Sequence, residues 1–488
     1  MLTDRAAAAA LATNAPRRAG PWWWLAPPLV LAVLGGWLLL RNHGLWYDEV
    51  YTAEVAPVPL GRLLRALAGG HGTIPYLRDA PPSYNAPYYA VAHLWLTVTR
   101  LPATEIGLRL FSLVSAVGAV AVFTRTVARL AADRRVALVA GLVAATNPFV
   151  VQYSAEARGY ALALLAVSCA ALGFARWLDG GGRWALWLYG TGVAVAGLAH
   201  WFALLVAVGF AVAAVVLRRR DAAGVVAVTA AAAAPTLVLI GIALGNGVGA
   251  SGAEWLRGVG GNAPWLTLRA WSGRYPPLLV VTVVAAGAGL AVGARHARVV
   301  AAAWVGAPVV LMTAGELVRP VFVDRYLLAA TLGLAVLVAL GVTRLRGWTG
   351  VGAAAAVLAL SVVSTAIEVN RPPKDDTRSA VALVAGRHVA GEPVVAAARW
   401  DALGVDHYVR VEHPALRRDL VLPGAPIPAS TTVWVVRRAA GGVKGDPRKL
   451  DDLDRELAGR RLRVTEEVRF DGRYADTLVQ RWDTAPAR

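Results

Sequence analysis

Two adjacent carboxylates, Asp48 and Glu49, are the residues in this sequence best suited to catalysis. They lie among aromatic side chains in the stretch Leu45–Thr52, directly after the first apolar run. A carboxylate positioned beside a bound hydroxyl can act as a general base and take its proton. A solvated acidic pair in a loop is the alternative interpretation. We predict that Asp48 and Glu49 are catalytic and that Tyr51, two residues further on, contacts substrate.

A second polar segment, Gln152–Tyr160, separates two long apolar runs and contains Glu156, Arg158 and Tyr160. Ionisable groups at membrane depth are costly and usually mark functional sites. The alternative is a turn at a helix end, in which Glu156 and Arg158 pair at the membrane interface. We predict that Glu156, Arg158 and Tyr160 bind substrate.

Three further places carry candidate binding residues. Arg325 and Tyr326 open a late apolar run, and an arginine there can hold a phosphate through two hydrogen bonds. Snorkelling of Arg325 to the interface is the alternative. His200 interrupts another apolar run, where a lone histidine is more often structural, and Tyr84 lies in the segment Pro81–Tyr84, which opens the next apolar segment.

These residues are spaced by apolar runs long enough to cross a membrane. Hydrophobic residues make up 57% of the 488 and charged residues only 16%, against about 25% in soluble proteins. A membrane-spanning helix needs about 20 apolar residues. We predict a polytopic α-helical membrane protein with 11 to 13 spans. The runs are Pro21–Leu40, Leu110–Thr124, Val136–Ala155, Gly159–Ala175, Trp184–Leu217 (two crossings), Ala222–Ala253, Pro276–Ala294, Val299–Gly315, Tyr326–Thr343 and Gly347–Ile367.

The basic residues predict the orientation of these spans. The net charge is +18, from 49 Lys and Arg against 31 Asp and Glu. In a soluble domain this excess would suggest nucleic acid, but arginines clustered in short loops follow the positive-inside rule, so no nucleic-acid partner is expected. Arg17 and Arg18 start the series, and the candidate residues fall at the opposite, extracytoplasmic ends. Two apolar segments, 82–99 and 107–124, lie between the external first loop and the basic cluster around Arg125–Arg135, which is predicted to be internal. Either one of them is re-entrant or interfacial, or the charge rule fails there.

The domain organisation follows from composition. Residues 1–20 are expected to be a cytoplasmic tail and residues 21–367 a transmembrane domain with an external first loop, 41–79. In that loop Leu60–Leu67 is amphipathic and suits the membrane surface. Residues 368–488 alternate charged helical segments with short apolar strands, which predicts a small extracytoplasmic α/β domain. Predicted strands include Pro393–Ala397 and Leu462–Phe470.

A metal or other cofactor is not expected. Cys169, the only cysteine, lies in an apolar run, which excludes disulfides and thiolate metal sites. The external acids form no cluster with histidine or cysteine at ligand spacing. Asp48 and Glu49 leave one alternative open, since paired carboxylates can hold a hard cation such as Mg²⁺ or Mn²⁺.

In their order along the chain, these motifs resemble the GT-C superfamily of glycosyltransferases, and family 39 with its bacterial relatives in particular. That group includes protein O-mannosyltransferases and lipid A aminoarabinose transferases. The matching elements span residues 45–328. They are the acidic pair in Trp46–Thr52, the segment Pro81–Tyr84, Arg109-Leu110, the turn Glu156–Tyr160 after Asn147–Phe149, and Arg325–Leu327.

The resemblance implies a glycosyltransferase that moves a sugar from a polyprenyl-phosphate carrier to an extracytoplasmic glycan, lipid or protein by inverting, direct displacement. It implies that Asp48 is the base, that Glu49 supports it or contacts the acceptor, and that Arg325 holds the carrier phosphate. The stretch Asp79–Pro82 lacks the lysine found there in many aminoarabinose-transferring relatives.

Two other functional classes remain open. A transporter or lipid flippase would place ionisable residues in broken helices at mid-membrane, whereas here they gather at one set of helix ends. A membrane-anchored binding protein would carry its active part in residues 368–488.

Overall fold

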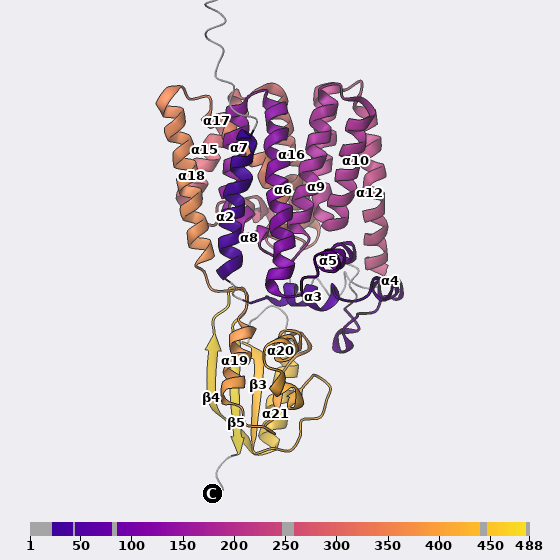
Figure 1. Ribbon diagram of the computed structural model, residues 1–488, viewed down its shortest axis with the longest axis vertical. Coiled ribbons are helices and arrows are strands. Elements are labelled where there is room, and N and C mark those ends of the chain that lie inside the picture. The colour runs from indigo at the N-terminus through magenta and orange to yellow at the C-terminus, as the bar shows by residue number, and fades with distance from the viewer. Residues whose placement is uncertain (1–21, 42–43, 81–84, 246–257, 440–446, 485–488) are drawn as a thin grey trace, which may run out of the picture.

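A computed structural model describes residues 22–41, 44–80, 85–245, 258–439 and 447–484. The molecule consists of a bundle of long helices and a smaller C-terminal domain beyond one end of it (Figure 1). Short helices of the first loop lie between the two parts (Figure 1). We call the end of the bundle that faces the C-terminal domain the domain-facing end.

The bundle contains helices of very different exposure. The segment Asp324–Val342, which ends in α17, is central and 94% buried, whereas α12 and α18 are only 11% and 22% buried and present apolar faces outward. Such a distribution suits a core helix surrounded by helices that face lipid. The bundle helices are α2 (Ala26–Arg41), α6 (Glu105–Ala131), α7 (Arg134–Thr146), α8 (Pro148–Ser154), α9 (Tyr160–Leu178), α10 (Gly182–Ala199), α11 (Leu204–Arg218), α12 (Ala222–Gly245), α14 (Ala263–Trp271), α15 (Pro276–Val292), α16 (Arg295–Val318), α17 (Thr331–Val342) and α18 (Gly347–Val369).

The number of spans is at or below the lower limit of the expected range. Eight helices within the described residues are long and apolar enough to cross a membrane, or up to ten if the bent pairs α7–α8 and α14–α15 each count as one span. Helix α10, with 18 residues, stands in the same bundle but is not among these apolar helices (Figure 1). The prediction of a polytopic α-helical membrane protein is confirmed.

The first loop explains the lower count. It forms α3 (Tyr47–Val55) and α4 (Leu60–Gly69), and α5 (Ala86–Thr99) follows it in the apolar segment 82–99. Helix α5 has 14 residues, which rise about 21 Å and fall short of the roughly 30 Å hydrocarbon core. It lies across the domain-facing end beside α3 instead of running with α6 (Figure 1). Of the two apolar segments 82–99 and 107–124, the first therefore does not span the membrane. The basic residues around Arg125–Arg135 then lie at the opposite end of the bundle, as the charge rule predicts.

Two breaks in the apolar runs bring the polar segments to the domain-facing end. Asn147 caps α8 by accepting hydrogen bonds from the backbone N–H groups of Phe149 and Val150, and Pro148 starts the helix, so that α7 and α8 meet at 62°. His200 is extended between α10 and the short helix Trp201–Ala203, which splits the run 184–217 into two helices as expected. A Cβ on Gly159 would lie 2.2 Å from the Ala199 carbonyl oxygen, so the turn before α9 packs directly on the end of α10.

The C-terminal domain is built on a five-stranded sheet with strand order β2-β1-β3-β5-β4. Strand β1 is parallel to β2 and β3, and β5 is antiparallel to β3 and β4. A small α/β domain was predicted, and β4 has the predicted bounds, but β2 and α20 were not foreseen. The elements are α19 (Thr377–Arg387), β1 (Val394–Ala396), α20 (Arg399–Val411), β2 (Leu420–Val421), β3 (Thr432–Arg438), α21 (Pro447–Gly459), β4 (Leu462–Phe470) and β5 (Thr477–Thr484).

Helix α20 holds the first loop against the C-terminal domain. The Tyr408 hydroxyl accepts a hydrogen bond from the Leu45 N–H at 2.6 Å and donates to the Leu45 carbonyl oxygen at 3.1 Å. Trp400 packs edge-on against Tyr47 with ring centroids 5.2 Å apart. Leu403 is fully buried in the hydrophobic cluster of the first loop. The C-terminal domain therefore fixes the start of α3, which carries Asp48 and Glu49.

Candidate active site

Glu49 is the most tightly held of the two carboxylates. It is 1% exposed and accepts two hydrogen bonds from Arg109, Nε to Oε1 at 2.8 Å and Nη2 to Oε2 at 2.5 Å. The backbone N–H of Ala157 donates to the same Oε1 at 2.8 Å. A two-point arginine–carboxylate contact fixes orientation as well as distance. Glu49 thus connects α3, α6 and the turn before α9.

Asp48 faces the other way, toward arginines. Its side chain is 18% exposed, and its Oδ2 lies 3.9 Å from Nη2 of Arg325. Its backbone carbonyl oxygen is 3.4 Å from Nη1 of Arg158, which also donates to the Tyr89 hydroxyl at 2.9 Å. Arg325 therefore lies beside the Asp48 carboxylate, and Arg158 lies beside the backbone of the same residue.

Arg325 is surrounded by aromatic groups. Its Nε donates to the Tyr160 hydroxyl at 2.9 Å, and its guanidinium carbon lies 5.7 Å from the Trp46 ring centroid and 5.9 Å from that of Tyr326. The residue is 9% exposed, in a short helix that spans Asp324–Ala330 at the start of α17. Packing and hydrogen bonding hold this cation in place beside Asp48.

His200 lies among the aromatic side chains around Arg325 rather than beside the carboxylates of Asp48 and Glu49. Its ring centroid lies 4.9 Å from that of Tyr160 and 5.1 Å from that of Tyr326. Burial, with contributions from Arg158 and Arg325, lowers the pKa of His200 to about 3. It is therefore neutral at physiological pH, and it packs against the rings that surround Arg325.

The sequence interpretation missed Lys374, which lies in the segment between α18 and α19. Its Nζ lies 2.5 Å from Oε2 of Glu156 and 4.1 Å from the centroid of the Trp46 ring, and the residue is 7% exposed. Burial raises the pKa of the Glu156 carboxyl, and the Lys374 ammonium opposes that rise. One signal was available: this arginine-rich chain has three lysines, and Lys374 lies shortly after the last span.

The next residue, Asp375, connects the segment that contains Lys374 to α3, the helix that carries Asp48 and Glu49. Its Oδ2 accepts a hydrogen bond from the Tyr47 N–H at 3.0 Å and lies 3.7 Å from Nη2 of Arg438 on β3. Burial raises the pKa of Asp375, while Arg438 lowers it. A carboxylate at the N-terminus of a helix is stabilised by the helix dipole.

The structure brings together most of the predicted site residues, but not all of them. The structure brings Asp48, Glu49, Glu156, Arg158 and Arg325 together at the domain-facing end of the bundle, with Tyr160, His200 and Tyr326 packed behind Arg325. Tyr51 donates its hydroxyl hydrogen to the Ala80 carbonyl oxygen at 2.8 Å and lies beside Tyr89. Tyr84 lies outside the described residues.

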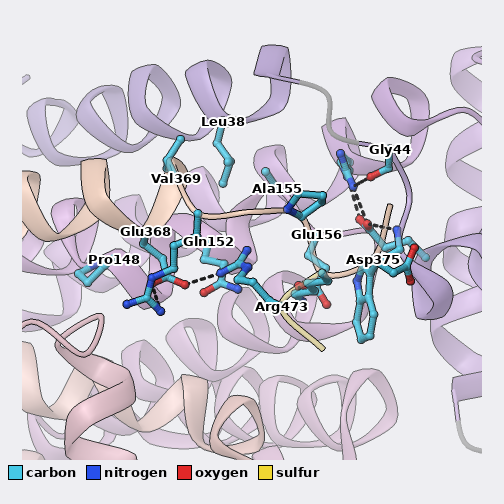
Figure 2. Close-up of a pocket in the computed structure, with 16 residues that line it drawn as sticks. Leu38, Gly44, Pro148, Gln152, Ala155, Glu156, Glu368, Val369, Asp375 and Arg473 are labelled. Carbon is cyan, nitrogen blue, oxygen red and sulfur yellow. Dashed lines mark hydrogen bonds and ion pairs between the residues drawn. The ribbon is translucent and has the colours of Figure 1, made fainter. Parts of the chain in front are cut away.

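A small cavity of about 90 Å³ adjoins this cluster (Figure 2). Trp46, Glu49, Arg109, Glu156 and Lys374 form part of its wall. Further wall residues come from the ends of α2, α8 and α18 and from Arg473 of the C-terminal domain. Within the described residues, no three His, Cys, Asp or Glu side chains gather as a metal site would require.

Comparisons with known proteins identify the fold. No protein-family model matches the chain, and no curated protein matches it by sequence. Its structure is similar to ArnT from Cupriavidus metallidurans bound to undecaprenyl phosphate, with a TM-score of 0.55, 13% identity, and 95% of this chain and 98% of that chain covered. The apo state of the same protein gives a TM-score of 0.52 at 13% identity, with 88% and 93% covered.

An apo oligosaccharyltransferase from Archaeoglobus fulgidus also has a TM-score of 0.52, at 11% identity, with 86% of this chain and 70% of that chain covered. Both neighbours are GT-C glycosyltransferases. At these identities the likeness establishes the fold and not the reaction. The chain has the GT-C fold, as its motifs predicted.

Proposed function

We propose that this GT-C-fold protein transfers a sugar from a polyprenyl-phosphate carrier to an extracytoplasmic acceptor. The observation that carries the proposal is the pairing of an accessible carboxylate, Asp48, with a buried arginine, Arg325, at 3.9 Å. It is supported by the likeness to a structure whose bound molecule is undecaprenyl phosphate. A flippase would need its ionisable groups along a path through the membrane, and here they lie at one end.

The proposed reaction is a single inverting displacement. Asp48 takes the proton from the acceptor hydroxyl, and the hydroxyl oxygen attacks the anomeric carbon of the carrier-bound sugar. The bond between that carbon and the phosphate oxygen breaks, and the carrier leaves as its phosphate. Arg325 and Arg158 stabilise the negative charge of the phosphate as it separates. Glu49, fully engaged by Arg109, positions α3 and contacts no reacting atom.

The acceptor can be found by comparing envelope glycans, glycolipids and glycoproteins from cells with and without the gene by mass spectrometry. One glycosyl modification should disappear on deletion and return with the wild-type gene. It should stay absent when the gene encodes Asp48→Asn. A complete set of modifications in the deletion strain would contradict the proposal.

Arg325→Ala should weaken binding of polyprenyl phosphate. Loss of a charge-assisted hydrogen bond costs about 1.5–3 kcal/mol, or roughly a 10- to 150-fold loss of affinity. Binding of undecaprenyl phosphate to protein in nanodiscs measures it. Arg274→Ala is the matched control, because that side chain is 45% exposed and lies 3.4 Å from Asp324. Equal affinities in the two variants would show that Arg325 only packs at the interface.

Divalent metal should be dispensable, because the proposed leaving phosphate is neutralised by guanidinium groups. Transfer measured after EDTA treatment should match that of untreated protein. Activity that is lost in EDTA and restored by Mn²⁺ would instead assign the Asp48–Glu49 pair a cation.

The active site should face the outside of the cell, where a flipped lipid-linked sugar is available and nucleotide sugars are not. In a Cys169→Ala background, single cysteines can replace exposed residues at Gly261 and Gly386, on the domain-facing side, and at Ala223, beside the cluster Arg218–Arg220. A membrane-impermeant maleimide should label the first two in intact cells and Ala223→Cys only after the membrane is opened. Labelling of Gly261→Cys and Gly386→Cys from opposite sides would rule out a single external site.

A further inference from the structure

The cavity beside the catalytic cluster has a balanced set of charges. Its charged wall residues are the acids Glu49, Glu156, Glu368 and Asp375 and the bases Arg109, Arg371, Lys374 and Arg473. Glu49 pairs with Arg109, Glu156 with Lys374, and Glu368 with Arg473 at 2.5 Å. An anionic or cationic ligand would compete with a pair already made, and separating a buried pair is costly. The cavity therefore favours a neutral ligand.

Four buried polar atoms of this wall make no hydrogen bond within the described part of the chain. They are two acceptors, Oε1 of Glu156 and Oε2 of Glu368, and two donors, Nε1 of Trp46 and Nε of Arg473. Oε2 of Glu368 lies 3.1 Å from Nη1 of Arg371. Glu156 is 4% exposed. A buried polar atom without a partner costs about 1–3 kcal/mol, so a ligand that satisfies the atoms of Trp46, Glu156 and Arg473 gains affinity. Hydroxyl groups both donate and accept, as this combination requires.

The remaining wall suits the same chemistry. The half-buried Gln152 brings an amide that can donate and accept, and it lies between Glu368 and Glu156 in the view of Figure 2. The indole of Trp46 adds an aromatic surface against which the apolar face of a sugar ring can pack. Neutral charge, paired donors and acceptors, and one aromatic surface together describe a site for a sugar.

The cavity also adjoins the proposed reaction centre. Lys374 lies 4.1 Å from the Trp46 ring centroid and lines the cavity, while Arg325 lies 5.7 Å from the same centroid and reaches toward Asp48. Resting on the proposed function, we propose that this cavity binds a neutral sugar unit of the acceptor. The acceptor is accordingly a glycan or glycolipid, whose hydroxyls are held by Glu156, Gln152 and Arg473.

Saturation-transfer NMR with the methyl glycosides of glucose, mannose and galactose tests this proposal on full-length protein in nanodiscs. At least one glycoside should bind. Gln152→Ala and Glu156→Gln should each weaken that binding about tenfold, whereas Thr349→Ala, in the first turn of α18 at the opposite end, should not. Asp48→Asn should also bind the glycoside normally, because Asp48 does not line the cavity. An Asp48→Asn variant that binds the glycoside but transfers no sugar would show that the two proposals can be tested separately.

Three results would overturn the proposal. They are the absence of binding by all three glycosides, binding unchanged in both Gln152→Ala and Glu156→Gln, and competition by inorganic phosphate, which would indicate an anion site. Undecaprenyl phosphate binding shows whether each variant is folded. If Glu156→Gln fails that check, Gln152→Ala decides, because its side chain carries no charge and leaves every ion pair of the wall in place.

Discussion

Transfer by Asp48→Asn should fall by about 10²–10⁴-fold, because the proposed base is lost. Asparagine has the same shape as aspartate, and the contacts that hold α3 in place are made by Glu49 and by the backbone of Leu45 and Tyr47. The fold and the affinity for undecaprenyl phosphate should therefore be kept. Transfer of sugar from the native lipid-linked donor, measured with purified protein in nanodiscs, checks the prediction.

Asp79→Asn provides the matched control for this loss. Asp79 is an acid of the same loop, 60% exposed and paired with Arg399 at 2.8 Å. An exposed pair of this kind is worth about 0–1 kcal/mol, so transfer should be unchanged. Wild-type rates in Asp48→Asn would show that another group takes the proton.

Arg109→Met should destabilise the protein by about 3–5 kcal/mol, because it leaves the buried Glu49 carboxylate without its partner. The free energy of unfolding in SDS measures the effect. Arg399→Met is the control at an exposed pair and should change it by less than about 1 kcal/mol.

A double variant distinguishes loss of the pair from loss of packing. In Arg109→Met with Glu49→Gln the unpaired charge is gone, so much of the stability should return. Transfer should stay low even then, because α3 has lost the two-point contact with Arg109 that fixes it to α6. A loss of less than about 1 kcal/mol in Arg109→Met alone would contradict the positioning role of Glu49.

Local sequence features predicted the helical bundle and its polar breaks. The Asn147–Pro148 pair ends one helix and starts the next, and His200 interrupts a run long enough for two crossings. Such signals act within a few residues, and hydrophobic periodicity records them directly. Helix α5 was ambiguous because its composition resembles that of a span while its length of 14 residues does not.

The partners of the site residues could not be predicted in the same way. Glu49 and Arg109 are 60 residues apart, and Glu156 and Lys374 are 218 apart, so their pairing depends on how the helices and the C-terminal domain pack. The C-terminal domain was not needed for the resemblance. The structure nevertheless shows that it holds the start of α3 through Tyr408 and Asp375 and that Lys374, in the segment leading to it, reaches Glu156.

The most direct test of lipid-linked transfer is the fate of the carrier. Protein in nanodiscs is mixed with polyprenyl-phosphate sugars and with envelope acceptors extracted from the deletion strain, and the lipids are followed by mass spectrometry. The account predicts that one polyprenyl-phosphate sugar is consumed, that free polyprenyl phosphate appears in equal amount, and that Asp48→Asn releases none. Sugar transfer that leaves the polyprenyl-phosphate sugars intact, or that needs a nucleotide sugar, would contradict it.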